Sequence, residues 1–503
     1  MLFTALFPIS MKRFHVLHSL QTKIHAYLPA FVVGVTLLYI TFFSTLAILR
    51  LITVHSHYYD LGIMDQTVFN TATGHFLELT NPHQGGNTSS RLAIHFDPLL
   101  AIFAPIYALY SNPAVLLVGQ AVIVGLGIFL IYHIALSVLK SRAPAFGFAL
   151  LFASNYIVQN AIMFDFHAVT LVMTTLLAMY LFFVIQPLKR TWINTAFGYL
   201  FLILSLMGKE NVGLTTAFFG LYLLCILKRK VVGLTVVGIS LLTMIAVNAF
   251  IIPHFSYGLS PSVSYYDIKH PASLLARLWD IHTFEYVLGL IMPVGFLSLV
   301  SPLSLLVGVP EILVNLTSSN ANMSSFAFQY TSVIIPFVFI SAINGYGVLL
   351  RKIPIMNKAK IGLTLFSFLL AGNCLLIATN TSWIKINYSV NQAQLEFLNK
   401  WRAYTKDPSL IVSTSGSLAP FFTERRTFID FFYDPSYQNT GRTTDELMSN
   451  AEVDQYEKAK YILLFEDDTP IDNELSQYYY NKLKTNADYK LIDQAEGIVV
   501  YAR

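Results

Sequence analysis

The carboxylates of this chain are few, and they lie where apolar runs end. Ahead of residue 385 the acidic residues are Asp60, Asp65, Glu78, Asp97, Asp165, Glu210, Asp267, Asp280, Glu285 and Glu311. Carboxylates act as general bases and as ligands of divalent metals. A chain that concentrates them at the ends of apolar segments is therefore predicted to do chemistry at a membrane surface.

Asp60 and Asp65 are the catalytic candidates, in the stretch "HSHYYDLGIMDQTVFNT" (His55 to Thr71). Two positions five residues apart differ by about 140° around a helix, so one continuous helix would not aim both carboxylates at one target. Gly62 lies between them, and we expect it to allow a turn. The competing interpretation is a solvated loop that merely ends a span, and it has more weight for Asp65 than for Asp60.

Two further stretches carry candidate ligands. The segment "SSRLAIHFDPLL" contains Arg91, followed by His95 and Asp97 two residues apart, a spacing that suits metal ligands in an extended segment. In "FDFHAVTL", Asp165 and His167 have the same spacing and are predicted to bind a divalent metal. The alternative for Asp165 is an N-cap of the helix that follows.

Charges also interrupt apolar segments. Lys209 and Glu210 break an otherwise apolar hairpin from 193 to 227, and Glu311 lies inside a predicted span. Such residues are functional candidates by default, because charges are costly within a bilayer. For Lys209 and Glu210 the alternative is a mutual ion pair that marks a tight turn. Arg277 belongs to the juxtamembrane amphipathic segment "HPASLLARLW", and it is either an interfacial residue or a ligand of a lipid phosphate.

The elements that must position these residues are membrane helices. The chain has 503 residues, of which 55% are hydrophobic and only 12% are charged, whereas soluble proteins carry about 25% charged residues. The net charge is +4, and no stripe of Lys and Arg predicts a nucleic-acid partner. Cys225 and Cys374 lie inside apolar runs, which favours packing residues over a disulfide or a metal pair.

A membrane span needs about 20 apolar residues, and we predict a polytopic α-helical membrane protein with about eleven spans. These are expected near residues 28–53, 114–138, 143–162, 168–186, 193–208, 211–227, 231–252, 285–301, 303–317, 331–350 and 361–379. Lys and Arg gather in alternate loops, with 14 on one side against 4 or 5 on the other. In a plasma membrane this distribution predicts a cytoplasmic N-terminus and an outer C-terminus.

Three regions are predicted. Residues 1–27 form a cytoplasmic or interfacial segment, and residues 28–384 form a transmembrane domain with outer loops 54–113 and 253–284. Residues 385–503 contain more charges and shorter apolar runs. Here "PSLIVSTS", "KYILLF" and "GIVVYAR" are expected strands, whereas "NQAQLEFLNKWRAYT" and "DNELSQYYYNKL" are expected helices. This alternation predicts a small α/β domain outside the membrane.

The motifs together resemble those of a known family. The segments "YDLGIMDQ", "RLAIHFDPLL", "FDFH", "GKEN", "SPLSLL" and "FQYTSVIIPF" are similar to a family of predicted microbial membrane proteins of unknown function, which is grouped with the GT-C glycosyltransferases. The resemblance covers roughly residues 55 to 350. One position departs from it, because Gln329–Tyr330 stand where the family is expected to have an aromatic-flanked His.

The resemblance implies a GT-C-like fold and transfer of a sugar from a polyprenyl-phosphate donor to an unknown glycan, lipid or protein acceptor outside the membrane. Asp60 would be the general base or the acid that orients the acceptor, with Asp65 as a second catalytic candidate. The residues expected to bind the donor phosphate are Arg91, Lys209 and Arg277. The expected ligands of a divalent metal, Mn²⁺ or Mg²⁺, are Asp165, His167 and Glu210; alternatively, Asp165 and His167 bind the donor phosphate. Further candidates are His95, Asp97 and Glu311.

Two other functions compete with glycosyl transfer. A transporter or flippase should carry its charges near mid-membrane, in helices interrupted at matching positions of two repeats. The sequence has no clear repeat, and only Glu311 is expected to lie deep. A non-catalytic scaffold would keep its function when Asp60, Asp165 and Glu210 are neutralised.

Overall fold

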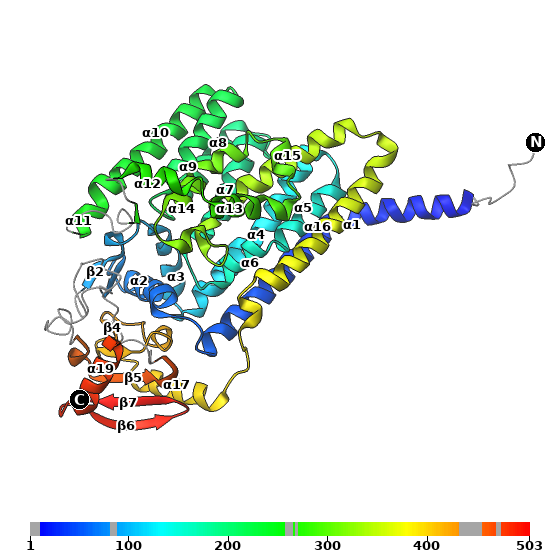
Figure 1. Cartoon of the computed structure of the whole chain (residues 1–503). Coiled ribbons are helices and arrows are strands. Elements are labelled where there is room, and N and C mark those ends of the chain that lie inside the picture. The colour runs from blue at the N-terminus through cyan, green and yellow to red at the C-terminus, as the bar shows by residue number, and fades with distance from the viewer. Residues whose placement is uncertain (1–10, 81–87, 257–264, 267–269, 432–454, 469–473) are drawn as a thin grey trace, which may run out of the picture.

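The computed structural model describes residues 11–80, 88–256, 265–266, 270–431, 455–468 and 474–503. Residues 1–10 of the predicted N-terminal segment, parts of both predicted outer loops, and Asp267 lie outside these described residues. A large helical part is followed by a small sheet-containing part near the C-terminus (Figure 1).

Five helices in the described part are long and apolar enough to cross a membrane. They are Tyr27–Ile52, Ala114–Leu139, Ala168–Ile185, Lys230–Ser256 and Asn357–Asn380. A sixth candidate is the pair α5 (Arg142–Ala153) and α6 (Tyr156–Met163), which are bent by 43° at their junction. Multi-pass membrane character is thus confirmed, and the count of eleven spans stays a prediction.

The remaining expected spans correspond to shorter helices in the described part. They include α8 (Thr191–Leu206), α9 (Val212–Leu221), α13 (Ile281–Ile291), α14 (Val309–Thr317) and the 18-residue α15 (Ile335–Lys352). Between α13 and α14 the backbone forms short 3-10 turns rather than one helix. Proline cannot donate the helical hydrogen bond, and Pro293, Pro302 and the left-handed Gly295 (φ +64°) account for these breaks.

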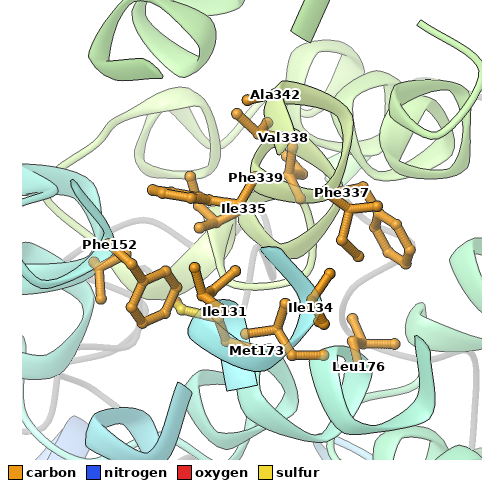
Figure 2. Close-up of a cluster of buried hydrophobic side chains, with 14 of the residues drawn as sticks. Ile131, Ile134, Phe152, Met173, Leu176, Ile335, Phe337, Val338, Phe339 and Ala342 are labelled. Atoms are coloured by element: carbon orange, nitrogen blue, oxygen red, sulfur yellow. The ribbon is translucent and has the colours of Figure 1, made fainter. Parts of the chain in front are cut away.

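The membrane core centres on α4 (Ala114–Leu139), which packs against α1 (Met11–Ile52), α5, α7 (Ala168–Tyr180) and α15. Figure 2 shows side chains of α4, α7 and α15 meeting in this core, among them Ile131, Met173 and Phe337. α4 is apolar on all sides, as expected of a helix surrounded by other helices and lipid. The core holds α6, α7 and the turn between them in place, and that turn carries two of the predicted site residues.

The segment that follows α1 (residues 54–113) is predicted to lie outside the membrane, and we call it the first outer segment. A π-helical turn at Tyr58–Gly62 leads into α2 (Ile63–Ala72), and β1 (Glu78–Thr80) pairs antiparallel with β2 (Thr88–Ser90). The expected turn at Gly62 is wrong, because the chain stays helical there (φ −63°, ψ −44°). A Cβ at Gly62 would approach the ring of Tyr58 to 3.0 Å, so this glycine permits close packing instead.

The C-terminal part is an α/β unit, as expected. Its strands are β3 (Val412–Thr414), β4 (Phe428–Asp430), β5 (Tyr461–Phe465), β6 (Lys490–Ala495) and β7 (Ile498–Ala502), in the order β4-β3-β5-β7-β6. The β3 strand is parallel to β4 and β5, whereas β7 is antiparallel to both β5 and β6. The two expected helices are α17 (Gln392–Tyr404) and α19 (Glu474–Thr485). The edge strands β4 and β6 were not predicted.

The C-terminal α/β unit, which we call the sheet unit (residues 385–503), packs on the first outer segment and shares a hydrophobic core with it. The ring of Tyr58 lies 5.0 Å from that of Phe428, centroid to centroid, and both side chains are buried. The backbone N–H of Tyr58 donates to Gly416 O at 2.9 Å, and that of Phe428 donates to Thr80 Oγ1 at 2.8 Å. Burying an aromatic side chain contributes roughly 1.5–3 kcal/mol. The sheet therefore supports the segment that begins at Tyr58, two residues before Asp60.

Candidate functional site

A cavity of about 600 Å³ opens between the first outer segment, the α6–α7 turn, the α8–α9 turn and residues 314–330. Among the predicted site residues, those that line it are Asp60, Arg91, His95, Asp97, His167, Lys209 and Glu210. The predicted residues that do not line it are Asp65, Asp165, Arg277 and Glu311. Segments more than 100 residues apart in sequence thus bring seven candidates to one place.

Asp60 and His167 form a pair on this cavity. His167 Nε2 lies 3.2 Å from Asp60 Oδ1, and the Asp60 side chain remains 27% exposed. A carboxylate that is held by an imidazole yet still reaches solvent can accept a proton from a bound hydroxyl group.

Gln120, which the sequence analysis did not single out, fixes the turn that carries His167. This fully buried side chain donates to Asp165 O at 2.8 Å and to Ile162 O at 3.0 Å. Its Oε1 accepts the backbone N–H of His167 at 3.0 Å. A single carboxamide within the otherwise apolar stretch "AVLLVGQAVIVGL" is the signal that could have identified it.

Asp165 faces away from the cavity and ties the turn to the end of α1. Arg50 Nε lies 3.2 Å from Asp165 Oδ1, and Ser56 Oγ donates to the same oxygen at 2.6 Å. Asp165 has φ +72°, a left-handed conformation that side chains rarely adopt. The alternative role as N-cap is wrong, because His167 occupies the N-cap position of α7. Burial raises the pKa of Asp165, although Arg50 opposes this shift.

His95 and Glu210 form a second imidazole–carboxylate pair on the cavity. His95 Nδ1 lies 2.9 Å from Glu210 Oε1, and the backbone N–H of Phe96 donates to Glu210 Oε2 at 3.2 Å. Burial raises the pKa of Glu210, but the interactions with His95 and with Lys209 outweigh it, so the net pKa lies well below the ordinary value. Glu210 is thus an anion that orients His95. The alternative interpretation, a mutual ion pair of Lys209 and Glu210, does not describe this arrangement, because Glu210 pairs with His95.

Arg91 and Asp97 are joined by a bidentate ion pair. Arg91 Nε donates to Asp97 Oδ1 at 3.1 Å and Arg91 Nη2 donates to Oδ2 at 2.8 Å, and both side chains are 5% exposed. This geometry is the strong form of an arginine–carboxylate contact. The ion pair forms part of the cavity wall. It also occupies Nε and Nη2 of the guanidinium that was expected to bind phosphate.

Lys209 lies over the ring of Tyr330, with Nζ 4.8 Å from the ring centroid. Among the described residues, no carboxylate oxygen lies within 4.0 Å of this ammonium. Glu311 is buried in α14, where its Oε1 accepts a hydrogen bond from Asn211 Nδ2 at 2.6 Å. Lys209 is therefore a cation on the cavity wall that is available to an anionic ligand.

Asp65 and Arg277 lie apart from the cavity. Asp65 is fully buried in α2, where Tyr107 Oη donates to Oδ1 at 2.7 Å and Thr423 Oγ1 of the sheet unit donates to Oδ2 at 2.8 Å. Arg277, the last residue of α12 (Pro271–Arg277), donates to the backbone carbonyl of Ser318. Asp65 thus joins the sheet unit to the first outer segment, and Arg277 holds the chain near residue 318.

The stability of the protein is expected to fall as the pH rises, because of Asp65. Burial, followed by the charge of Glu424, raises the pKa of Asp65 to about 8 from an ordinary 3.8. Since the folded-state pKa exceeds the unfolded one, the stabilisation is complete below pH 3.8 and is lost as the pH rises through about 8. The midpoint of thermal unfolding in detergent should drop between pH 5 and pH 9 by less in Asp65→Asn, which cannot ionise. Equal drops in the two proteins would contradict this assignment.

The three predicted metal ligands are not brought together. Asp165 pairs with Arg50, His167 with Asp60, and Glu210 with His95. Within the described residues, no group of three or more His, Cys, Asp or Glu side chains could hold a metal ion. The described residues therefore do not assemble this ligand set, and a metal requirement stays a prediction.

Comparison with known proteins gives a family and a fold. Residues 50–500 match the family described as "Predicted membrane protein (DUF2079)", and no curated protein matches the chain. The crystal structure of ArnT from Cupriavidus metallidurans bound to undecaprenyl phosphate is similar over 93% of this chain and 98% of that chain, with a TM-score of 0.53 at 11% identity. The apo state of ArnT gives a TM-score of 0.52 at 12% identity over the same shares.

Likeness at this level of identity establishes the fold alone. The ArnT-like arrangement extends over most of both chains, and the family match begins at residue 50, just ahead of the first outer segment, and ends at residue 500. The chain is therefore a member of the DUF2079 family of predicted membrane proteins, and its fold is like that of ArnT.

Proposed function

We propose that this protein is a membrane glycosyltransferase that moves a sugar from a polyprenyl-phosphate donor to an acceptor hydroxyl group at the outer face of the plasma membrane. The observation that carries the proposal is a single cavity lined by an accessible carboxylate, Asp60, and by an available cation, Lys209. Glycosyl transfer needs both a base for the acceptor and positive charge for the departing phosphate. The fold shared with ArnT, crystallised with undecaprenyl phosphate, supports the lipid class.

In the proposed reaction the acceptor oxygen attacks the anomeric carbon of the sugar. The bond from that carbon to the phosphate oxygen breaks, and the acceptor proton passes to Asp60. His167 Nε2 lies 3.2 Å from Asp60 Oδ1, and this contact holds the carboxylate and leaves Oδ2 for the incoming proton. The polyprenyl phosphate departs as an anion, and Lys209 neutralises part of its charge.

His95 is assigned a supporting part in the same reaction. With Nδ1–H directed to the anionic Glu210, the imidazole keeps Nε2 for a ligand in the cavity. In its neutral form a histidine oriented in this way accepts a hydrogen bond from the acceptor hydroxyl group through Nε2, and in its protonated form it donates one to the phosphate. Glu210 then acts as a positioning residue through His95.

Replacing Lys209 by methionine is expected to weaken the binding of undecaprenyl phosphate by about 10- to 100-fold, since a charge-assisted hydrogen bond is lost. The dissociation constant can be measured with the protein in detergent micelles. Lys406→Met removes an exposed lysine of the sheet unit and should leave the affinity unchanged. Equal affinities for wild type and Lys209→Met would remove Lys209 from the phosphate site.

The cavity is assigned to the outer side, as the distribution of Lys and Arg predicts. A cysteine at the exposed Ser389, in a chain with Cys225 and Cys374 replaced by alanine, should react with an impermeant thiol reagent in intact cells. Labelling that requires lysis would reverse the proposed orientation.

The proposed activity is tested directly with purified protein and a panel of undecaprenyl phosphates that carry different sugars. A glycan and lipid extract supplies acceptors, and the release of free undecaprenyl phosphate is measured. We expect release from at least one donor, and the same assay with Mn²⁺, Mg²⁺ or a chelator tests for a metal requirement. If folded protein released no undecaprenyl phosphate from any of the donors, the proposal would be contradicted and transport would be favoured.

A further inference from the structure

The cavity has a charged wall and an uncharged wall, and the two come from different parts of the sequence. Every charged residue among the described lining residues lies between positions 59 and 211, whereas those between positions 214 and 330 are all uncharged. This second wall carries four carboxamides, which are Asn248, Asn320, Asn322 and Gln329. It also carries the phenols Tyr265, Tyr266 and Tyr330.

Gln329 is the most buried carboxamide of this wall. It begins a 3-10 turn (Gln329–Thr331), and its side chain belongs to a residue that is only 6% exposed. Its Oε1 has no hydrogen-bond partner among the described residues. A buried carbonyl oxygen without a donor is costly in a folded protein, so a ligand that brings a donor would be favoured here after a small rotation of the side chain.

Aromatic rings flank Gln329. Phe328 lies edge-on to Phe164 with ring centroids 4.5 Å apart, and Tyr330 lies beneath Lys209. Rings next to carboxamides offer an apolar surface beside hydrogen-bonding groups. A sugar ring has the matching chemistry, because it presents C–H groups on its faces and hydroxyl groups on its rim.

The carboxylates of the charged wall are already paired, so they are poor partners for a charged sugar. Asp60 is engaged by His167, Glu210 by His95, and Asp97 by Arg91. With Lys209 assigned to the phosphate, an ammonium or carboxylate on the sugar would have to leave water for charged groups that are already paired, which is unfavourable. Hydroxyl groups both donate and accept, as carboxamides do, so they suit this wall without any net charge.

We infer that the wall formed by Asn248, Asn320, Asn322, Gln329 and the adjacent tyrosines binds an uncharged glycosyl group with free hydroxyl groups. The inference rests on the proposed function and names its sugar class. The phosphate of the same donor lies at Lys209, which contacts the ring of Tyr330 and so connects the two walls.

The test compares binding of bare undecaprenyl phosphate with binding of its esters of glucose, galactose, mannose, glucosamine and glucuronic acid. At least one neutral ester should bind about tenfold more tightly than the bare lipid, as one or two good hydrogen bonds would give. The amino and acidic esters should show no such gain. A gain confined to a charged ester, or absent from all the esters while the bare lipid binds, would overturn the inference.

Variants separate this subsite from the phosphate site. Gln329→Leu should remove most of the tenfold gain of the neutral ester while the affinity for the bare lipid stays unchanged. Asn322→Ala changes an exposed residue, which protects the test against misfolding, and should reduce the gain about threefold. Gln392→Leu, at an exposed position of α17, is the matched control and should behave as wild type.

The outcomes also distinguish the two proposals. Unchanged gain in both Gln329→Leu and Asn322→Ala would overturn the carboxamide subsite while leaving glycosyl transfer standing. Failure of wild-type protein to bind undecaprenyl phosphate in any form would overturn the proposed function itself.

Discussion

Asp60→Asn is expected to lower the rate of sugar transfer by about 10²- to 10⁴-fold, the usual contribution of a positioned general base. Asparagine has nearly the same shape as aspartate, and its carbonyl oxygen can take the place of Oδ1, which lies 3.2 Å from His167 Nε2. It cannot take up a proton from the acceptor. The loss should therefore appear in kcat rather than in the affinity for undecaprenyl phosphate.

The measurement is release of undecaprenyl phosphate under single-turnover conditions, together with the midpoint of thermal unfolding. Glu285→Gln makes the same chemical change at an exposed position of α13 and should leave the rate unchanged. Activity of Asp60→Asn within threefold of wild type would exclude Asp60 as the base. If the loss of rate were accompanied by a clearly lower midpoint of thermal unfolding, Asp60 would have a structural role instead.

Much of the site could be predicted because buried or membrane-level charge is rare and conspicuous. Asp60, His167, Lys209 and Glu210 stand out in an apolar sequence and do line one cavity. Their partners could not be predicted, because pairing depends on how distant loops meet. Asp60 meets a histidine 107 positions away, and Glu210 one 115 positions away.

The metal prediction depended on an extended segment, in which residues two apart point the same way. The positive φ of Asp165 breaks that rule and turns its carboxylate towards Arg50, while His167 turns towards Asp60. Gln120 stands out as a lone carboxamide in an apolar helix, but its role could not be predicted. Only the fold shows that it holds the α6–α7 turn.

The fold, like the site, could be predicted in part. Long apolar runs predicted the long helices, but runs containing Pro293 and Pro302 became short helices and 3-10 turns. In the sheet unit the three predicted strands lie in clear apolar runs, whereas β6 exposes most of its residues and lacks the two-sided burial that makes central strands recognisable. The β4 strand is buried but has only three residues and follows closely on the charged residues Glu424, Arg425 and Arg426.

Asp97→Asn is expected to destabilise the protein by about 3–5 kcal/mol, the usual result of removing one partner from a buried ion pair. The change leaves the Arg91 guanidinium, whose side chain is 5% exposed, without a compensating charge. The midpoint of thermal unfolding in detergent should fall clearly. In the double variant Arg91→Met with Asp97→Leu, much of this stability should return, because neither buried charge remains.

An exposed ion pair provides the matched control for this effect. Lys400 Nζ lies 2.7 Å from Asp493 Oδ2, but the Lys400 side chain is 63% exposed, and exposed pairs contribute less than about 1 kcal/mol. Lys400→Met should therefore shift the unfolding midpoint little. If Asp97→Asn shifted it no more than Lys400→Met, the Arg91–Asp97 pair would not be buried as described. Arg91 would then be free for the donor phosphate, and Lys209 would no longer be the only assigned cation.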